Sequence, residues 1–329
     1  MKTIKVDFIG FWSNFNKTDN LFYNILKEKY VVEIGEDPDF VFVSPLCKPF
    51  EYLKYDCVRI LFTGEPLSPD FNVFDYAIGF DNLSCLDAEG LNRYYRFPLC
   101  VYGYERTEKF AAGISYDEAK KILENKKYFC NFMYGHKSAK GERELILSTV
   151  EKYKRVESAG SFLNNMPDGK VVPYSDKKID FLRMCKFTIA CESISHPGFV
   201  TEKLTDPFVA YSIPIYFGNP LVGKEFNTKA FVNCHEYDSF DEALNKVIEI
   251  DNNDELYIEM LMQNKFVSED YYDNLCAGLK SFLWQICSRK PQEAYRRMRF
   301  YIAKDHESYL NEYRKFSNSI WYKIFKKLN

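Results

Sequence analysis

The sequence predicts an α/β fold made of two Rossmann-like domains, and three observations carry this prediction. The chain has 329 residues, which is enough for two domains of ordinary size. Apolar runs of strand length alternate with helical patterns in both halves of the chain. A polar stretch, residues 106–126, separates the two alternating series. Because strands that alternate with helices pair in parallel, each half is expected to form a parallel sheet covered by helices on both faces.

The first series occupies the N-terminal third of the chain. Its apolar runs are typical of strands and cover residues 4–8, 39–43, 57–62 and 77–80. The apolar residues between positions 21 and 26 have the spacing of one helix face.

The second series follows the polar stretch. Strands are expected at residues 127–134, 155–158, 186–191, 213–217 and 230–234. Helices are expected at residues 140–153, 177–184, 201–211 and 240–250. Ligands of such folds bind at the carboxyl ends of strands, so we expect the two domains to face a cleft. The expected domains are residues 1–115 and 116–311, followed by a tail at 312–329.

Charge, cysteine usage and hydropathy exclude several classes of protein. The net charge is −3, whereas nucleic-acid-binding domains are clearly basic. The ten cysteines form no CxxC pair and no cluster with zinc spacing, which predicts buried thiols and no metal site. The N-terminus lacks the apolar core of a signal peptide, and no apolar run approaches the ~18 residues of a membrane-spanning helix. A cytoplasmic protein is therefore expected.

One motif, residues 191–204, leads from a buried strand through a polar loop into a helix. Thr201 is a suitable N-cap, and Glu202 and Lys203 fall in the first helical turn. A helix N-terminus attracts anions, so Lys203 would add positive charge toward a pyrophosphate, and Glu202 could accept hydrogen bonds from ribose hydroxyls. The spacing supports equally a structural interpretation, in which Glu202 complements the helix dipole and Lys203 is solvated.

Common phosphate-binding signatures give no second candidate. Neither GxGxxG nor GxxxxGK[ST] occurs in the chain. Asp37-Pro38-Asp39 is a DxD sequence, which holds a metal-bound nucleotide in some enzymes. Here it precedes its strand, so the turn interpretation is favoured.

Two long segments of the chain resemble glycosyltransferase family 10, the α-1,3/4-fucosyltransferases. The segment that resembles the donor-binding motif comprises residues 199–206, 213–220, 226–227 and 230–233. Residues 62–65 and 71–81 resemble the acceptor-domain motif of the bacterial members. The resemblance implies a GT-B fold and an inverting transfer of L-fucose from GDP-fucose, with no essential metal or other cofactor. The implied acceptor is a GlcNAc hydroxyl of an N-acetyllactosamine or Lewis-type glycan, joined in α-1,3 linkage.

The resemblance also implies roles for individual residues. Glu65 matches the base that deprotonates the acceptor hydroxyl; the alternative is a loop carboxylate that caps a turn. Arg143 and Lys203 match the cations that neutralise the β-phosphate of the leaving GDP. The alternative for Arg143 is a helix-surface residue paired with a nearby Glu. Glu202 matches the ribose-binding Glu, and Glu192 matches a carboxylate near the sugar.

Phe199 and Thr201 complete the expected donor-binding set, and Phe199 departs from the family pattern. The family usually has Tyr at that position, so any hydrogen bond from the hydroxyl is lost. Pro207 is predicted to kink the helix that follows Lys203 or to end it early. Residues 295–299 lack the His and Asp of the HxRRxD motif of other fucosyltransferases, which disfavours an α-1,2 or α-1,6 enzyme.

The C-terminal tail, residues 312–329, is basic and amphipathic. It carries five Lys or Arg residues against one Glu. Its apolar face consists of Ile320, Trp321, Ile324, Phe325 and Leu328. Such a segment predicts peripheral contact with the inner face of a membrane, and a terminal helix packed on the body of the protein is an equal alternative.

Two other functions stay open at this point. One is a GT-B enzyme that uses another nucleotide sugar, and the other is a catalytically silent glycan-binding protein on the same fold. The joint presence of Glu65, Arg143, Glu202 and Lys203 argues against the silent protein.

Overall fold

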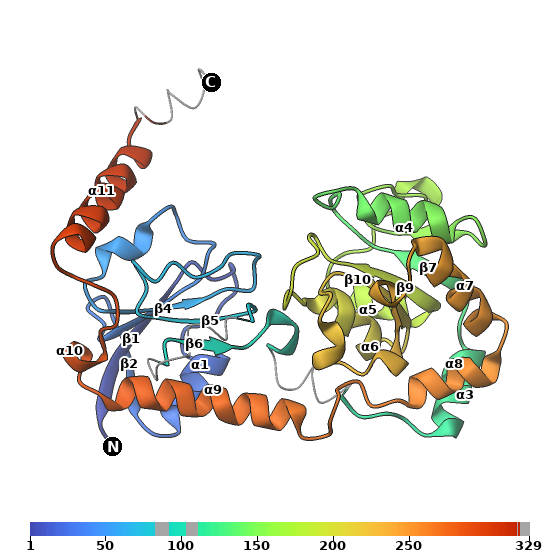
Figure 1. The fold of residues 1–329 in the computed structure, drawn as a ribbon, viewed down its shortest axis with the longest axis horizontal. Helices are drawn as coiled ribbons and strands as arrows, with labels where there is room; N and C mark the ends of the chain where they lie inside the picture. The colour runs from blue at the N-terminus through green and yellow to red at the C-terminus, as the bar shows by residue number, and fades with distance from the viewer. Residues whose placement is uncertain (83–91, 103–110, 321, 323–329) are drawn as a thin grey trace. The chain divides into compact units, whose positions relative to one another are not determined.

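The computed structural model describes residues 1–82, 92–102, 111–320 and 322 (Figure 1). The chain forms two compact units. The first contains Met1–Phe97 together with Leu275–Asn329, and the second contains Pro98–Asn274. Each unit is described by itself below.

The first unit is built on a parallel sheet of six strands in the order β2-β1-β3-β4-β5-β6. The strands are β1 (Thr3–Ile9), β2 (Val31–Ile34), β3 (Phe40–Val43), β4 (Val58–Phe62), β5 (Tyr76–Gly79) and β6 (Tyr94–Arg96). Every residue of β3, β4 and β5 is buried, which is the pattern of central strands covered on both faces. The expected strands of the N-terminal third are thereby confirmed.

Helices from both ends of the chain complete the first unit. They are α1 (Leu21–Lys27), α10 (Pro291–Ala294), α11 (Ile302–Ser317) and most of α9 (Tyr271–Ser288). The indole N–H of Trp284 in α9 donates to the carbonyl of Ile25 in α1 (3.1 Å), and the Tyr95 hydroxyl donates to the carbonyl of Leu275 (2.7 Å). The rings of Tyr95 and Phe282 stack with centroids 5.7 Å apart.

These contacts correct the expected domain boundaries. The sequence predicts a first domain of residues 1–115 and a second of 116–311, whereas the chain leaves the first unit at residue 97 and returns to it at residue 275. The return was missed because the contacts of α9 join residues about 180 to 260 positions apart, which no local pattern reveals.

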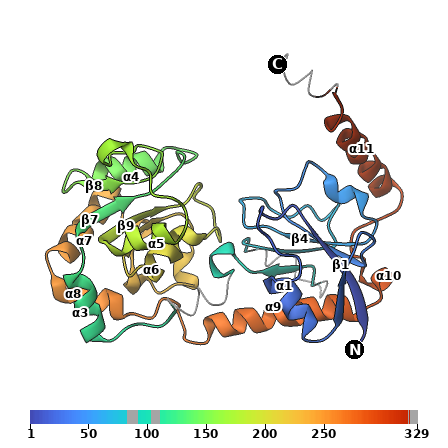
Figure 2. The ribbon, with the colours of Figure 1, turned by 180° about the vertical axis from the view of Figure 1, so that it is seen from behind.

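The second unit is built on a parallel sheet of five strands in the order β11-β10-β9-β7-β8. The strands are β7 (Tyr128–Phe132), β8 (Val156–Ser158), β9 (Cys185–Cys191), β10 (Ile213–Phe217) and β11 (Val232–Asn233). Its helices are α3 (Tyr116–Glu124), α4 (Glu142–Val150), α5 (Asp176–Arg183), α6 (Glu202–Val209), α7 (Phe240–Asp251) and α8 (Asp254–Met262). Helices α5 and α6 lie side by side in both views of the fold (Figures 1 and 2).

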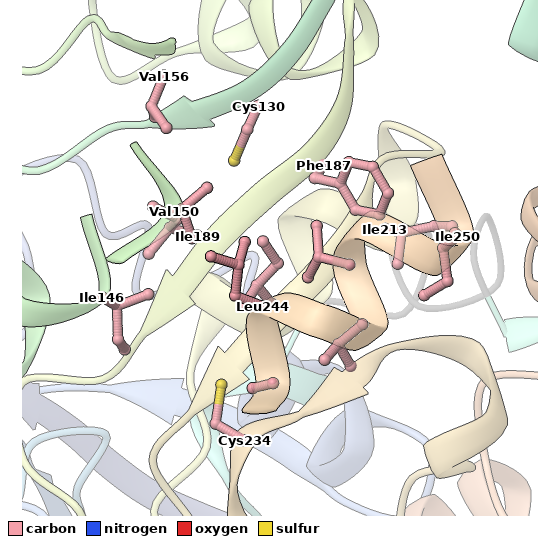
Figure 3. Packing of buried hydrophobic residues seen from close by; sticks show 14 of the residues in the cluster. Cys130, Ile146, Val150, Val156, Phe187, Ile189, Ile213, Cys234, Leu244 and Ile250 are labelled. Carbon is pink, nitrogen blue, oxygen red and sulfur yellow. The ribbon is translucent and has the colours of Figure 1, made fainter. Parts of the chain in front are cut away.

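The core of the second unit forms where helix faces meet the central strands. Phe187 and Ile189 of β9 pack with Ile146 of α4 and Leu244 of α7 (Figure 3). Cys130 lies in the same cluster and is a free, buried thiol. The elements expected from 127 to 250 are confirmed, with ends that differ by a few residues.

The prediction of a polar linker is wrong for residues 116–124. This segment is α3, which begins at a capping box between Ser115 and Glu118 and buries Ala119. Its remaining residues are mostly polar because only a narrow face packs on α8. Residues 103–110 of the expected linker lie outside the described residues.

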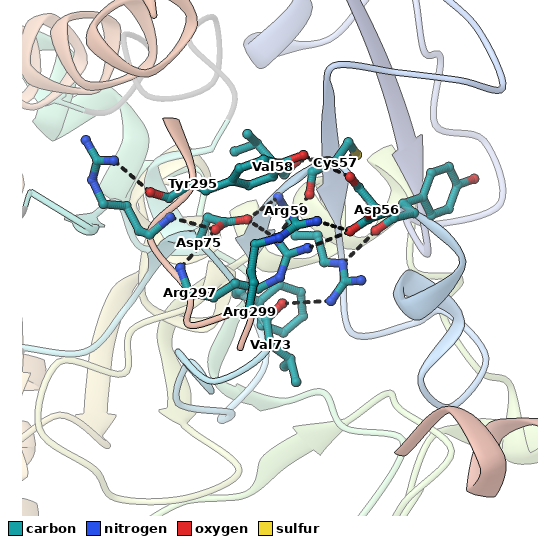
Figure 4. Close-up of polar contacts among 12 residues, drawn as sticks. Asp56, Cys57, Val58, Arg59, Val73, Asp75, Tyr295, Arg297 and Arg299 are labelled. Carbon is teal, nitrogen blue, oxygen red and sulfur yellow. Dashed lines mark hydrogen bonds and ion pairs between the residues drawn. The ribbon is translucent and has the colours of Figure 1, made fainter. Parts of the chain in front are cut away.

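Within the first unit, a buried ionic network connects residues 295–299 to Asp75 and to Arg59 of β4 (Figure 4). Arg297 is paired with Asp75, and both side chains are fully buried. The backbone N–H groups of Arg296 and Arg297 donate to the same carboxylate at 2.8 and 3.0 Å. The Arg59 backbone N–H donates to it as well, at 2.9 Å. Residues 295–299, which lack the His and Asp of the HxRRxD motif, therefore have a structural role. They supply several of the hydrogen-bond donors that the buried Asp75 carboxylate needs.

The C-terminal helix α11 contacts the rest of the first unit at Glu307 and Tyr313, although none of its residues is buried. Arg59 forms an ion pair with Glu307 at 2.5 Å, and the rings of Phe50 and Tyr313 meet at 5.7 Å. Trp321, Ile324, Phe325 and Leu328 of the expected apolar face lie outside the described residues. Across the described ranges, no helix has both the length and the hydropathy needed to cross a bilayer.

Candidate functional site

The candidate site of the second unit forms where β9 and β10 end and α6 begins. Cys191 and Phe217 are partners in the register of the two strands, and Glu192 follows directly. Thr201 caps α6, since its hydroxyl accepts from the backbone N–H of Lys203 (3.4 Å). The motif predicted from residues 191–204 thus adopts the expected strand, loop and helix.

Glu192 is a buried carboxylate held in one orientation. It is 2% exposed and accepts hydrogen bonds from the backbone N–H and the hydroxyl of Thr201, at 2.7 and 2.8 Å. Gly218, at the end of β10, makes room for it, because an added Cβ would lie 2.4 Å from the Glu192 Cγ. Burial raises the pKa of Glu192, with the Lys203 ammonium opposing this shift.

Lys203 lies between two carboxylates at the start of α6. Its Nζ is 3.5 Å from Glu192 Oε2, 3.3 Å from Glu202 Oε1 and 3.0 Å from the Thr201 hydroxyl. Burial lowers the pKa of Lys203, but Glu192 and Glu202 outweigh it, and the net shift is upward. The interpretation of Lys203 as a solvated side chain is therefore wrong: it is a protonated, partly buried cation at a helix N-terminus, with a side chain that is 22% exposed.

Arg143 reaches the same strand end from α4. Gly141, with φ +81°, precedes the helix and sets Arg143 in its first turn. The guanidinium donates from Nη1 to the carbonyl of His136 (2.7 Å) and from Nε to the carbonyl of Cys191 (3.3 Å). It is 4% exposed, so the interpretation as a helix-surface residue is wrong. The structure brings Arg143 to the residue that precedes Glu192.

The Tyr134 ring supports this arginine and was missed in the sequence. The guanidinium carbon lies 4.2 Å from the ring centroid. The Tyr134 hydroxyl donates to the carbonyl of Ile189 (2.8 Å) and accepts from the N–H of Cys191 (2.6 Å). One side chain therefore positions both Arg143 and the end of β9. A tyrosine inside a buried strand run gives no local signal of such a role.

Glu202 borders a pocket of about 610 Å³ that extends along α5 and α6. The pocket is also lined by Tyr174, Lys178 and Asp206, and Lys178 forms an ion pair with Asp206 at 2.7 Å. Burial raises the pKa of Glu202, but Lys203 and Lys178 outweigh this, and the net shift is downward. The Glu202 carboxylate is thus an ionised hydrogen-bond acceptor at the edge of a cavity.

Phe199 and Thr201 take supporting positions in this site. Phe199 is 3% exposed, and Gly198 before it donates its N–H to the Asn219 side chain (2.8 Å). Thr201 uses its side chain on Glu192 and Lys203. Pro207 lies inside α6, which ends two residues later, at Val209. This agrees with the predicted early end of the helix.

Glu65 belongs to the first unit. It is exposed and follows β4 by three residues. Its backbone N–H donates to the Thr63 hydroxyl (3.2 Å), and that hydroxyl donates back to the Glu65 carbonyl (2.9 Å). This local turn fixes the Glu65 backbone at the carboxyl end of the strand, where parallel sheets bind ligands.

Asp37-Pro38-Asp39 lies in a bend that leads into the amino end of β3. The Asp39 carboxylate accepts from the backbone N–H of Lys5 (3.1 Å). Over the part of the chain that the structure describes, no group of three or more His, Cys, Asp or Glu residues could hold a metal ion.

Comparison with known proteins identifies the family of the chain. Residues 6–103 match a family described as the N-terminal domain of α-(1,3)-fucosyltransferase FucT. Residues 123–289 match the C-terminal part of glycosyltransferase family 10 (fucosyltransferase). The second match alone spans half of the chain.

Relatives and solved structures agree with these matches. An α-(1,3)-fucosyltransferase FucT of Helicobacter pylori is 30% identical over 78% of this chain and 59% of its own length. A putative fucosyltransferase R654 of Acanthamoeba polyphaga mimivirus is 28% identical over 66% of this chain and 35% of its own length. The crystal structure of an α1,3-fucosyltransferase matches with a TM-score of 0.69 and 26% identity, covering 86% of this chain and 90% of that one.

Three conclusions follow from the fold and these matches. The chain spans 59% and 35% of the two curated relatives, so it corresponds to part of their length. Two parallel α/β units and the likeness to the solved fucosyltransferase confirm the predicted GT-B fold. The chain belongs to glycosyltransferase family 10.

Proposed function

We propose that this protein transfers L-fucose from GDP-fucose to a glycan hydroxyl, with inversion at the anomeric carbon. The observation that carries the proposal is the pair of cations, Arg143 and Lys203, beside Glu192 at the end of β9. A solved α1,3-fucosyltransferase with GDP-fucose, 26% identical to this chain with a TM-score of 0.66, supports this choice of donor.

The two cations suit a nucleoside diphosphate as leaving group. Negative charge grows on the β-phosphate as the bond to the sugar breaks, and fixed donors aimed at that charge lower the barrier. Lys203 adds a full charge to the positive end of the α6 dipole. This arrangement would neutralise the diphosphate without a metal ion or other cofactor.

Glu202 suits the ribose of the donor. Its pKa is shifted downward, so it is an ionised acceptor that two vicinal hydroxyls could bind. The adjoining pocket of about 610 Å³ has room for the purine base and offers the Tyr174 ring together with charged groups. We assign GDP to this region of the second unit, with Phe199 and Thr201 supporting the loop.

Glu65 suits the general base. An acceptor hydroxyl is a poor nucleophile at neutral pH, and a positioned carboxylate can take its proton as it attacks the anomeric carbon. Glu65 is exposed at the carboxyl end of β4 and has its backbone fixed by Thr63. The acceptor class that we propose is a GlcNAc hydroxyl of an N-acetyllactosamine or Lewis-type glycan, in α-1,3 linkage.

A peripheral membrane contact is a further part of the proposal. The C-terminal segment exposes apolar side chains, with Tyr309 at 71% and Ile320 at 70%. The described part of α11 buries no residue, and basic residues follow in the tail. Apolar and cationic groups on one exposed segment favour an anionic membrane surface.

One assay separates the leading proposal from its alternatives. Purified protein is incubated with GDP-fucose and N-acetyllactosamine, and both GDP release and the linkage of the product are determined. Formation of an α-1,3-fucosylated product is expected. Transfer from another nucleotide sugar alone would favour a different donor, and glycan binding without any transfer would favour a silent binding protein.

A further inference from the structure

The loop between β1 and α1 presents a tryptophan at the end of the first unit's sheet. Trp12 is 36% exposed and lies between Phe11 and Phe15 in the chain. Its ring meets the Phe11 ring at 5.7 Å and the Phe15 ring at 5.2 Å, with interplanar angles of 68° and 88°. The indole stands steeply inclined to both neighbouring rings, and more than a third of its surface is exposed to solvent.

This loop is held firmly in place. Gly10, with φ +73°, turns the chain at the end of β1, where an added Cβ would lie 2.4 Å from the carbonyl oxygen of Ser44. Lys17 binds back to Asp7 of β1 at 2.5 Å, and Asp7 is nearly buried. Asp7 also accepts from the Tyr55 hydroxyl (3.2 Å). The loop therefore offers Trp12 in a preorganised position, which reduces the entropy cost of binding.

Ring contacts connect this loop to the turn that carries Glu65. Phe11 stacks on Phe62 with centroids 6.1 Å apart and an interplanar angle of 8°. Phe62 is the last residue of β4, and Glu65 follows it by three residues. Because β1 and β4 run parallel in one sheet (Figure 1), their carboxyl ends lie at the same edge. Trp12 and Glu65 are thus placed on one edge of the first unit.

We propose that Trp12 is an acceptor-binding residue on which a pyranose ring of the acceptor glycan stacks. The apolar C–H face of a sugar matches an indole in shape and polarity, and a neutral sugar needs no counter-charge. The stacked sugar would be bound at the sheet edge that carries the base. This inference rests on the proposed function, since it assigns the acceptor of the same reaction.

Calorimetric titration with N-acetyllactosamine in the presence of GDP tests the inference, using the full chain. Trp12→Ala is expected to weaken glycan binding roughly tenfold, and Trp12→Phe to recover most of the loss because a ring remains. Phe300→Ala is the matched control, because Phe300 is another exposed aromatic residue of the first unit, at 74%. GDP affinity should be unchanged in all three variants, because Trp12 and Phe300 belong to the first unit and the assigned nucleotide site to the second.

Glycan affinity of Trp12→Ala equal to that of the wild type would overturn the inference while leaving the proposed transfer intact. A wild-type protein that binds no N-acetyllactosamine would overturn it together with the acceptor class, and GDP release from GDP-fucose would still test the donor. If Trp12→Ala and Trp12→Phe bind equally weakly, a stacking role is excluded. A Trp12→Ala variant that raises the KM for the acceptor and keeps its kcat supports the inference.

Discussion

Lys203 Nζ lies 3.5 Å from Glu192 Oε2, and that carboxylate is fixed in turn by two hydrogen bonds from Thr201. The cation at the start of α6 is therefore positioned by a neighbouring strand end and by its own helix cap. In a GDP-fucose transferase this placement would set the ammonium group toward the diphosphate before the donor arrives, which is the condition for electrostatic catalysis.

The first prediction concerns charge at the leaving group. Lys203→Met keeps the length of the side chain and removes its charge, so kcat should fall about 100-fold, equivalent to about 3 kcal/mol of transition-state stabilisation. Arg143→Met should act in the same direction. Steady-state GDP release measures both variants, and Lys246→Met serves as the control, because the partly exposed Lys246 of α7 pairs with Glu249 (2.9 Å). Rates near that of the wild type for both variants would contradict the assigned roles, as would loss of activity on adding EDTA.

A second prediction concerns donor selection. GDP should bind more tightly than UDP or ADP, because the proposal places a guanine base in the pocket beside Glu202. Calorimetry with the three diphosphates makes the comparison directly. Equal affinities would mean that only the diphosphate and ribose are recognised, and the assignment of GDP-fucose would fail.

A third prediction concerns stability against pH. Burial lowers the pKa of Lys126 to about 7, and its Nζ donates to the carbonyls of Arg183 (2.9 Å) and Tyr211 (2.6 Å). Above pH 7 the folded state has released a proton that the unfolded state keeps until about pH 10.5, so this group makes the free energy of unfolding rise over that range.

Lys126→Met should therefore flatten the dependence of unfolding free energy on pH between 7 and 10. Chemical denaturation of wild type and variant across that range measures the difference in slope. Lys127→Met changes an exposed neighbour and should leave the slope as it is in the wild type. Parallel slopes for wild type and Lys126→Met would show that Lys126 keeps an ordinary pKa in the folded state.

A fourth prediction concerns the C-terminal tail. Removal of residues 318–329 deletes the apolar and basic end, but keeps the pairing of Arg59 with Glu307 and the contact of Phe50 with Tyr313. Binding to anionic vesicles in a flotation assay should fall, and GDP affinity should stay the same. Undiminished vesicle binding would exclude this segment as the membrane contact, and global unfolding would favour a helix packed on the body.

Much of the fold could be predicted because its signals are local. The strands β9 and β10 are mostly apolar runs, and the predicted range of β10 agrees with its bounds at both ends. The helix start at Thr201 was readable from the cap residue and the charges that follow it. What escaped prediction depends on pairing over long sequence distances, such as the return of α9 to the first unit, or on short edge strands such as β2 and β6.

The candidate site was predictable in part for the same reason. Thr201, Glu202 and Lys203 are consecutive, so a single sequence motif predicts all three as site residues. Arg143 was identified by resemblance. Its buried position was not predictable, because the carbonyls of residues 136 and 191, which accept its hydrogen bonds, come together only in the folded chain. Tyr134 and Gly218 act through packing on Arg143 and Glu192, and neither residue type indicates such a role in the sequence.

The base assignment is the central claim, and Glu65→Gln tests it most directly. The substitution keeps the size of the side chain and removes its basicity, so kcat for transfer to N-acetyllactosamine should fall roughly 10²–10⁴-fold. GDP affinity should be unchanged, since Glu65 belongs to the first unit and the assigned nucleotide site to the second. Glu36→Gln, another exposed carboxylate of the first unit, should keep full activity. A Glu65→Gln protein that transfers fucose at the wild-type rate would contradict the account.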